Sequence, residues 1–183
     1  MSLPLDGIRV LDCTIWQMGP AATASLGDLG AEVIKIEEPI GGDPVREAKW
    51  AKGEFVELPQ GKCCYFEHHN RNKKGIILNL KSEAGKQVLF RLVEKSDVFV
   101  QNFRPGVAEK LGIDYKTLSS YNPMIIYASA TGFGRKGPDA KEPAFDLLGQ
   151  ARSGLMTTAG EPDGPPVLHS VGTADQIGAI MMA

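Results

Sequence analysis

The sequence has few cysteines, with only three in 183 residues, at Cys13, Cys63 and Cys64. This number is odd, and the adjacent pair cannot easily form a disulfide with itself. A disulfide framework of the kind found in small secreted proteins is therefore excluded, and the cysteine content indicates a protein of the reducing cytoplasm.

Long apolar runs are also missing. Residues 1–9 contain charged side chains and Pro4, and they have no apolar core of the kind that a signal peptide needs. No later stretch approaches the roughly 20 apolar residues of a membrane-spanning helix. These absences predict a soluble protein that carries no targeting segment.

Charge of one sign is not in excess, since 20 basic and 22 acidic residues give a formal net charge of -2. Without a basic field, sequence-independent nucleic-acid binding is excluded as the main activity. The apolar content of 43% is typical of a folded domain. Any anionic ligand must therefore be bound by a local site.

Apolar, β-branched segments alternate with helical patterns along the chain, which predicts an α/β fold with parallel strands. Ser82 is the expected N-cap of one helix. Residues 38–75 show little periodicity, and we expect this long segment to help cover a ligand. Strands are expected at residues 8–14, 32–37, 76–80, 97–101 and 124–130, and helices at 21–29, 82–95, 107–111, 115–119, 145–153 and 172–183.

Two motifs suggest sites that the surrounding residues do not support. Gly132, Gly134 and Gly137 match a dinucleotide fingerprint, but Pro138 and Pro143 prevent the helix that this fingerprint requires, so we expect a loop there. The adjacent histidines at 68–69 lack a partner at metal-ligand spacing, so no metal site is expected.

Other polar residues leave two interpretations open. Clusters of basic side chains are more often solvated surfaces than phosphate sites, although residues 102–104 follow a strand, where ligands of open α/β sheets bind. His169 lies six residues before Asp175, and a role near a site stays open. Asp175 itself is either an aspartate favoured by a helix N-terminus or an ionised nucleophile. The basic clusters are Arg71, Lys73 and Lys74, and Arg104, Lys110 and Lys116.

Five ordered blocks resemble the class III CoA-transferases, a family of CaiB/BaiF type that also contains formyl-CoA and carnitine CoA-transferases and α-methylacyl-CoA racemases. The resemblance covers essentially the whole chain. The blocks are residues 4–12 (PLDGIRVLD), 30–37 (GAEVIKIE), 70–76 (NRNKKGI), 101–107 (QNFRPGV) and 127–134 (YASATGFG).

This resemblance implies that residues 1–183 form the N-terminal CoA-binding domain of a larger two-domain protein. The small domain, and the C-terminal segment that returns to the large domain, are expected to be absent from these 183 residues. The expected fold is a Rossmann-like parallel sheet with helices on both faces. The apolar end at residues 180–183 is consistent with more protein following. The implied assembly is a homodimer of interlocked chains, acting on an acyl-CoA and a carboxylic acid, with no nucleic acid or membrane partner.

The resemblance also implies roles for individual residues. Asp175 follows the turn at residues 160–166 and matches the catalytic aspartate, which would form an anhydride and then a thioester with CoA. Gln17 matches a glutamine near the reacting carbonyl. Coenzyme A is the expected cofactor, bound as substrate and without a metal. Its implied contacts are Leu78, Lys81, Asn102, Phe103, Arg104, Lys110 and Asp146.

Three positions depart from the family pattern. Glu38 stands where many members have an arginine, so the diphosphate needs another cation, and Lys110 replaces a frequent arginine. Phe145 stands before Asp146 where racemases have a histidine, so transfer is favoured over racemisation. An acyl-CoA racemase or epimerase and a non-catalytic CoA-binding fragment are the alternatives.

Overall fold

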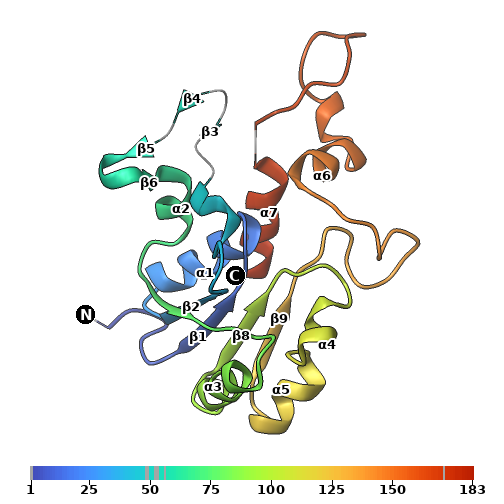
Figure 1. Ribbon diagram of the computed structural model, residues 1–183. Helices are drawn as coiled ribbons and strands as arrows, with labels where there is room; N and C mark the ends of the chain where they lie inside the picture. The colour runs from blue at the N-terminus through green and yellow to red at the C-terminus, as the bar shows by residue number, and fades with distance from the viewer. Residues whose placement is uncertain (1, 48–49, 52–53, 56, 171) are drawn as a thin grey trace.

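A five-stranded parallel sheet forms the centre of the structure, a computed structural model that describes residues 2–47, 50–51, 54–55, 57–170 and 172–183 (Figure 1). The strands follow one another across the sheet in the order β7-β2-β1-β8-β9, and all neighbours are parallel. This arrangement confirms the predicted Rossmann-like fold. The strands are β1 (Arg9–Cys13), β2 (Glu32–Glu37), β7 (Lys73–Ile77), β8 (Val98–Gln101) and β9 (Ile126–Ser129).

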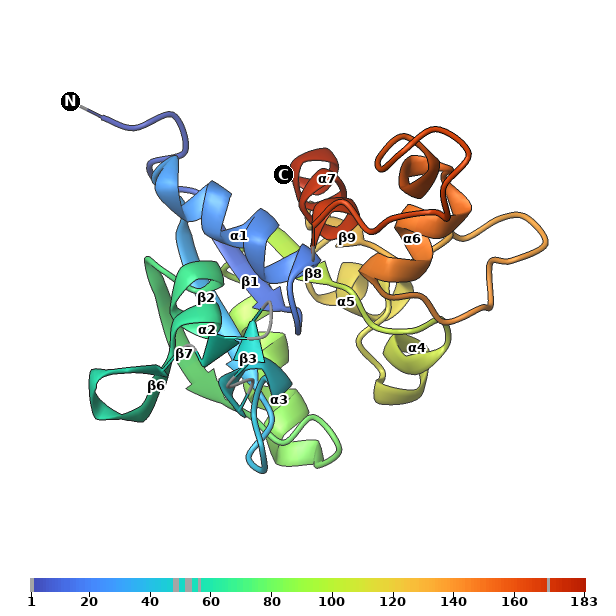
Figure 2. The same cartoon turned by 90° about the horizontal axis from the view of Figure 1, so that it is seen from above.

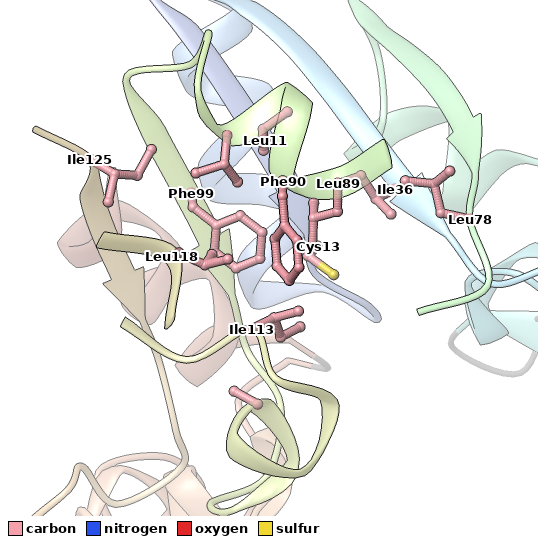
Figure 3. Packing of buried hydrophobic residues seen from close by; sticks show 12 residues of the cluster. Leu11, Cys13, Ile36, Leu78, Leu89, Phe90, Phe99, Ile113, Leu118 and Ile125 are labelled. Carbon is pink, nitrogen blue, oxygen red and sulfur yellow. The ribbon is translucent and has the colours of Figure 1, made fainter. Parts of the chain in front are cut away.

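Helices cover both faces of this sheet (Figure 2). Because successive strand residues point to opposite faces, Leu11 and Phe99 pack in a core beneath one set of helices (Figure 3), whereas Val10 and Val100 pack on the other side. The first face carries α3 (Glu83–Val93), α4 (Val107–Leu111) and α5 (Tyr115–Tyr121), and the second carries α1 (Met18–Asp28) and α7 (Thr173–Met182).

Short elements occupy the segment between β2 and β7, where the sequence shows little periodicity. Among them, α2 lies beside α1 and beside the 3-10 helix η1. They are the 3-10 helices η1 (Pro44–Glu47) and η2 (Pro59–Gly61), the hairpin strands β3 (Trp50–Ala51), β4 (Glu54–Phe55), β5 (Glu57–Leu58) and β6 (Lys62–Cys63), and α2 (Cys64–His69).

After β9 the chain runs without a helix through the glycine motif of residues 132–137, as expected, before α6 (Asp146–Arg152) and η3 (Leu155–Thr157). In the part of the chain that the structure describes, no helix has the length and apolar character needed to cross a membrane.

The strand expected at residues 76–80 was placed wrongly, because β7 runs from Lys73 to Ile77. Its first two residues are lysines, which made this part of the strand look like a surface cluster. β7 is an edge strand, and Lys73 reaches toward the start of α1 to pair with the buried Asp12. An edge strand tolerates such polar residues. The chain then turns at Asn79, whose carbonyl accepts a hydrogen bond from Ser82 N–H.

Ser82 caps α3 as predicted, since its Oγ accepts a hydrogen bond of 3.1 Å from Gly85 N–H. We expect Ser82→Ala to lower the free energy of unfolding by about 1 kcal/mol, because a first-turn N–H loses its acceptor. Chemical denaturation would measure this change. Ser120→Ala, which removes an exposed hydroxyl in α5, is the control and should change stability by less than about 0.5 kcal/mol.

Candidate active site

The order of the strands reverses between β1 and β8, because the chain first builds β2 and β7 on one side and then β8 and β9 on the other. Loops that leave neighbouring strands in opposite directions open a crevice at the carboxyl ends of the strands. A cavity of about 490 Å³ lies there, and we call it the central cavity. Four polar residues of its lining come from separate segments: Gln17, Asn102, Asp146 and Asp175.

Asp175 occupies the first turn of α7, where its carboxylate faces the central cavity. Burial, together with the negative charge of Asp146, raises the pKa of Asp175 from 3.8 to about 6. The group is therefore mainly ionised at neutral pH and is more basic than an ordinary aspartate. A carboxylate of this kind can act as a nucleophile or as a general base.

Asp146, at the start of α6, holds the N-terminus of α7 from outside that helix. Its Oδ1 accepts hydrogen bonds from the N–H groups of Ala174 (2.6 Å) and Asp175 (3.1 Å), and its Oδ2 accepts one from Gly172 N–H (2.8 Å). Gln150 Nε2 donates a further bond to Oδ2 at 2.8 Å. The carboxylate therefore caps the helix that carries Asp175, although it also lines the central cavity.

Gln17 reaches α7 through its side-chain amide, whose Nε2 donates to the carbonyl of Gly172 over 3.2 Å. Gly172 has a φ of 87°, and a Cβ at this position would lie 2.2 Å from Gln17 Nε2. Only glycine fits both the backbone conformation and the close approach. The contact joins two cavity-lining segments that are 155 residues apart in the chain.

Tyr65 on α2 completes the surroundings of Gln17, because its hydroxyl donates a hydrogen bond to Gln17 Oε1. Burial and the charges of Asp175 and Asp146 raise the pKa of Tyr65, so the phenol stays protonated and remains a donor. No sequence pattern pointed to this residue, since it lies in the segment without periodicity. That this segment helps to cover a ligand stays a prediction.

His69 links the same helix to α7. Its Nδ1 lies 2.8 Å from the carbonyl of Tyr65 and its Nε2 lies 3.2 Å from Gln176 Nε2. A carbonyl can only accept, so Nδ1 carries the proton and Nε2 accepts from the amide. Burial lowers the pKa of His69, which favours this neutral form. These contacts give His69 a structural role between α2 and α7.

Residues 102–104 lie at the carboxyl end of β8, as the sequence predicted, and all three line the central cavity. Asn102 exchanges two hydrogen bonds with the backbone of Ile15, so its amide joins this loop to the loop after β1. Arg104 is exposed and forms no ion pair within the described ranges, which leaves its guanidinium available to an anion.

A second, mainly apolar cavity of about 160 Å³ lies beyond Phe103, which lines both. Leu78 and Lys81 contribute to its wall, as does Glu38, whose carboxylate is 4.0 Å from Lys81 Nζ. Lys110 is exposed on α4 and lines neither cavity. The residues that the resemblance assigns to CoA are therefore brought to two adjoining cavities, apart from Lys110.

Each side chain of the first basic cluster forms an ion pair with a carboxylate of the same chain: Arg71 with Asp28, Lys73 with Asp12 and Lys74 with Glu32. His169 is exposed, bonds to Thr158 Oγ1 over 2.9 Å and lines neither cavity. Among the residues that the structure describes, no group of three or more histidines, cysteines and carboxylates lies close enough to hold a metal ion.

The chain belongs to CoA-transferase family III, whose sequence model matches residues 5–183. It is 43% identical to an acetyl-CoA:oxalate CoA-transferase of Acetobacter aceti over 98% of this chain and 44% of that protein. It is 41% identical to a succinyl-CoA:glutarate CoA-transferase of Homo sapiens over 94% of this chain and 38% of that protein. The chain thus spans less than half the length of these curated relatives.

Solved structures give the same relationship. A CAIB/BAIF family protein from Brucella suis is 37% identical and superimposes with a TM-score of 0.90, over 100% of this chain and 47% of that chain. The family resemblance and the fold expected from the sequence are therefore confirmed.

Proposed function

We propose that the protein transfers coenzyme A from an acyl-CoA to a carboxylic acid, with Asp175 as the nucleophile. The observation that carries this proposal is the half-buried carboxylate of Asp175, with its raised pKa, in a cavity at the switch point of the sheet. Relatives over 40% identical are named as CoA-transferases acting on formyl-, acetyl- or succinyl-CoA, which supports the same activity.

In the proposed reaction, the carboxylate of Asp175 takes part in each covalent intermediate in turn. The Asp175 oxygen attacks the thioester carbonyl, the C–S bond breaks, and CoA leaves as a thiolate, so that a mixed anhydride forms. The thiolate then attacks the Asp175 carbonyl, which releases the donor acid and leaves an aspartyl-CoA thioester. The acceptor carboxylate then attacks the aspartyl-CoA thioester, which releases the CoA thiolate and forms a second anhydride. The thiolate attacks the acceptor's carbonyl in this anhydride, which forms the CoA ester of the acceptor and regenerates the Asp175 carboxylate.

The side chains around Asp175 have separate tasks in this proposal. The Gln17 amide lies beside the reacting carbonyl, and Phe103 and Arg104 line the path of CoA, with Leu78 and Lys81 further along it. Arg104 and Lys81 supply positive charge for phosphates. Glu38 neutralises part of the charge of Lys81, so Arg104 carries more of this task.

Intact mass spectrometry tests the proposal directly. The complete protein is incubated with formyl-, acetyl- and succinyl-CoA, and its mass is recorded before and after hydroxylamine. An acyl- or CoA-sized adduct that hydroxylamine removes, and that Asp175→Asn lacks, is expected. Asp163→Asn, in the exposed turn before α7, is the matched control and should keep the adduct. An unchanged adduct in Asp175→Asn would refute the assignment of the nucleophile.

Tyr65→Phe is expected to lower kcat about 5- to 10-fold while leaving stability nearly unchanged, because Gln17 Oε1 loses its donor and the amide can rotate. Steady-state kinetics would measure this. Tyr127→Phe is the control, since that half-buried hydroxyl donates to the carbonyl of Ile113 away from the cavity. Equal kinetic effects of both substitutions would contradict a role of Tyr65 in orienting Gln17.

Racemisation of an acyl-CoA is the second candidate, because Asp175 could also remove an α-proton. Phe145 stands before Asp146 and offers no second acid or base, which favours transfer. Exchange of the α-proton in deuterated water, without any adduct, would favour the racemase. A third candidate is a CoA-binding module that does not turn over, and CoA binding without an adduct would support it.

The remaining proposals concern the complete protein. Residues 1–183 form its CoA-binding domain, a second and smaller domain completes the chain, and two chains interlock as a homodimer. Light scattering of the complete protein, which should give twice the mass of one chain, tests the dimer.

A further inference from the structure

The connection between β1 and α1, residues 14–17, is held by side chains from three other segments. Lys35 Nζ on β2 donates to the carbonyl of Thr14 over 2.9 Å. Trp16 N–H donates to Oδ1 of Asp43, in the segment after β2, over 3.1 Å. Between them, Asn102 holds both backbone groups of Ile15 at 2.8 and 2.9 Å. Three consecutive residues before Gln17 are therefore fixed through their backbone atoms.

Lys35 and Asp43 also pair with each other, with Lys35 Nζ 2.9 Å from Asp43 Oδ2. Their side chains are only 2% and 0% exposed. Such a pair stabilises a fold weakly, because removing two charges from water costs about as much as their attraction returns. Lys35 contacts the loop at Thr14 and Asp43 contacts it at Trp16. These contacts explain why a charged pair is buried beside the loop.

The backbone of this loop requires such support. Trp16 has a φ of 67°, a left-handed conformation that costs a residue with a bulky side chain about 1–2 kcal/mol. The bond to Asp43 is made by the N–H of this same residue. The conformation sends Trp16 and Gln17 into the central cavity, where the Trp16 ring meets Phe145 edge to face at 5.9 Å. A released loop would relax at Trp16 and move the Gln17 amide.

We propose that Lys35 and Asp43 are positioning residues, which fix the 14–17 loop and thereby orient Gln17 toward the group that reacts with Asp175. Their effect on rate rests on the proposed CoA transfer, whereas their effect on the loop does not. Neither residue lines the central cavity, and Lys35 lines neither cavity, whereas Asp43 also lines the second cavity. An effect of Asp43 through the loop is therefore told apart from a direct effect on CoA by the Gln17→Ala background and by the KM for acyl-CoA.

The double variant Lys35→Met/Asp43→Asn tests the proposal, because it removes both charges together and leaves no unpaired ion in the core. We expect a folded protein whose kcat is about 10- to 100-fold lower, with the KM for acyl-CoA changed less than about 3-fold, since a displaced catalytic group costs rate more than binding. In a Gln17→Ala background the same double substitution should cost less than about 3-fold, because residues that act through one group are not additive.

Leu118→Ala is the matched control, since Leu118 is a fully buried residue of α5 that lines neither cavity. It should lower stability and leave kcat unchanged. The positioning role is wrong if Leu118→Ala lowers kcat as much as the double variant does. It is also wrong if the double substitution lowers kcat by the same factor in the Gln17→Ala background as in the wild-type protein.

Fluorescence separates this inference from the proposed function. The chain has two tryptophans, so Trp50→Phe leaves Trp16 as the only reporter. In that background the double variant should shift Trp16 emission to the red and increase its quenching by acrylamide, whether or not the protein transfers CoA. Unchanged emission and quenching would overturn the positioning role. A wild-type protein without any adduct, combined with the expected red shift, would overturn the proposed function alone.

Discussion

Asp175→Asn is expected to abolish CoA transfer and, at the same time, to make the protein more stable at neutral pH. The loss of activity should be at least about 1,000-fold, because the amide cannot form the anhydride and the remaining site only binds the substrates. The gain in stability follows from the raised pKa of Asp175. At pH 7 the native protein holds a half-buried carboxylate near Asp146, and the neutral amide removes this unfavourable charge.

The sign of the effect follows from proton binding. The pKa of Asp175 is about 6 in the folded protein and near 3.8 in the unfolded chain, so the native state binds more protons between these values. Stability therefore falls as the pH rises from about 4 to 6 and stays lower above that range. With allowance for solvent screening, Asp175→Asn should raise the free energy of unfolding by about 1–2 kcal/mol at pH 7 and change it little at pH 4.

Urea denaturation of both proteins at pH 4 and pH 7 would measure this difference, and the same samples would give the activity. Asp163→Asn should change neither quantity. A loss of stability in Asp175→Asn at pH 7 would contradict the raised pKa, and residual activity above about 1% would contradict the role as nucleophile.

Asp146→Ala is expected to lower kcat about 100-fold and to reduce stability by about 2 kcal/mol. Three N–H groups at the start of α7 lose their acceptor, so the first turn frays and Asp175 is displaced. Asp114→Ala is the matched control, since Asp114 caps α5 through Thr117 N–H and lines neither cavity. It should cost about 1 kcal/mol and leave kcat unchanged.

Asp146→Asn separates the charge of Asp146 from its hydrogen bonds. One amide oxygen can still accept, but the negative charge next to Asp175 is gone. We expect the rate of adduct formation to rise with pH up to about 6 in the wild type, following the pKa of Asp175, and to level off at a lower pH in Asp146→Asn. Burial is the larger cause of the raised pKa, so the shift should be partial. An unchanged pH profile would show that Asp146 acts only as a cap.

The central strands could be predicted because buried parallel strands give short runs of apolar, β-branched residues. β2 has the predicted bounds, and β1 lies within the predicted run. β7 was misplaced because an edge strand accepts the two lysines at its start. The lengths of α2 and of the hairpins around it could not be predicted, since elements of two to six residues depend on tertiary contacts.

Asp175 and Gln17 were named as candidates from the family resemblance, and both line the central cavity. Their contacts could not be predicted in the same way. The cap from Asp146 to Asp175 joins residues 29 apart, and the bond from Gln17 to Gly172 joins residues 155 apart. Such contacts depend on how the helices pack on the sheet, which local patterns do not encode. Tyr65, Lys35 and Asp43 could not be identified from the sequence for the same reason.

The close approach of Gln17 to Gly172 makes these two positions one steric unit. Any side chain at 172 would have to occupy the space of the Gln17 amide, so a methyl group there should act on the protein much as the loss of the glutamine does. A shorter side chain at position 17 would remove this clash but not the strain of a side chain at a φ of 87°. Position 172 is therefore constrained twice, once by the space that it shares with Gln17 and once by its own backbone.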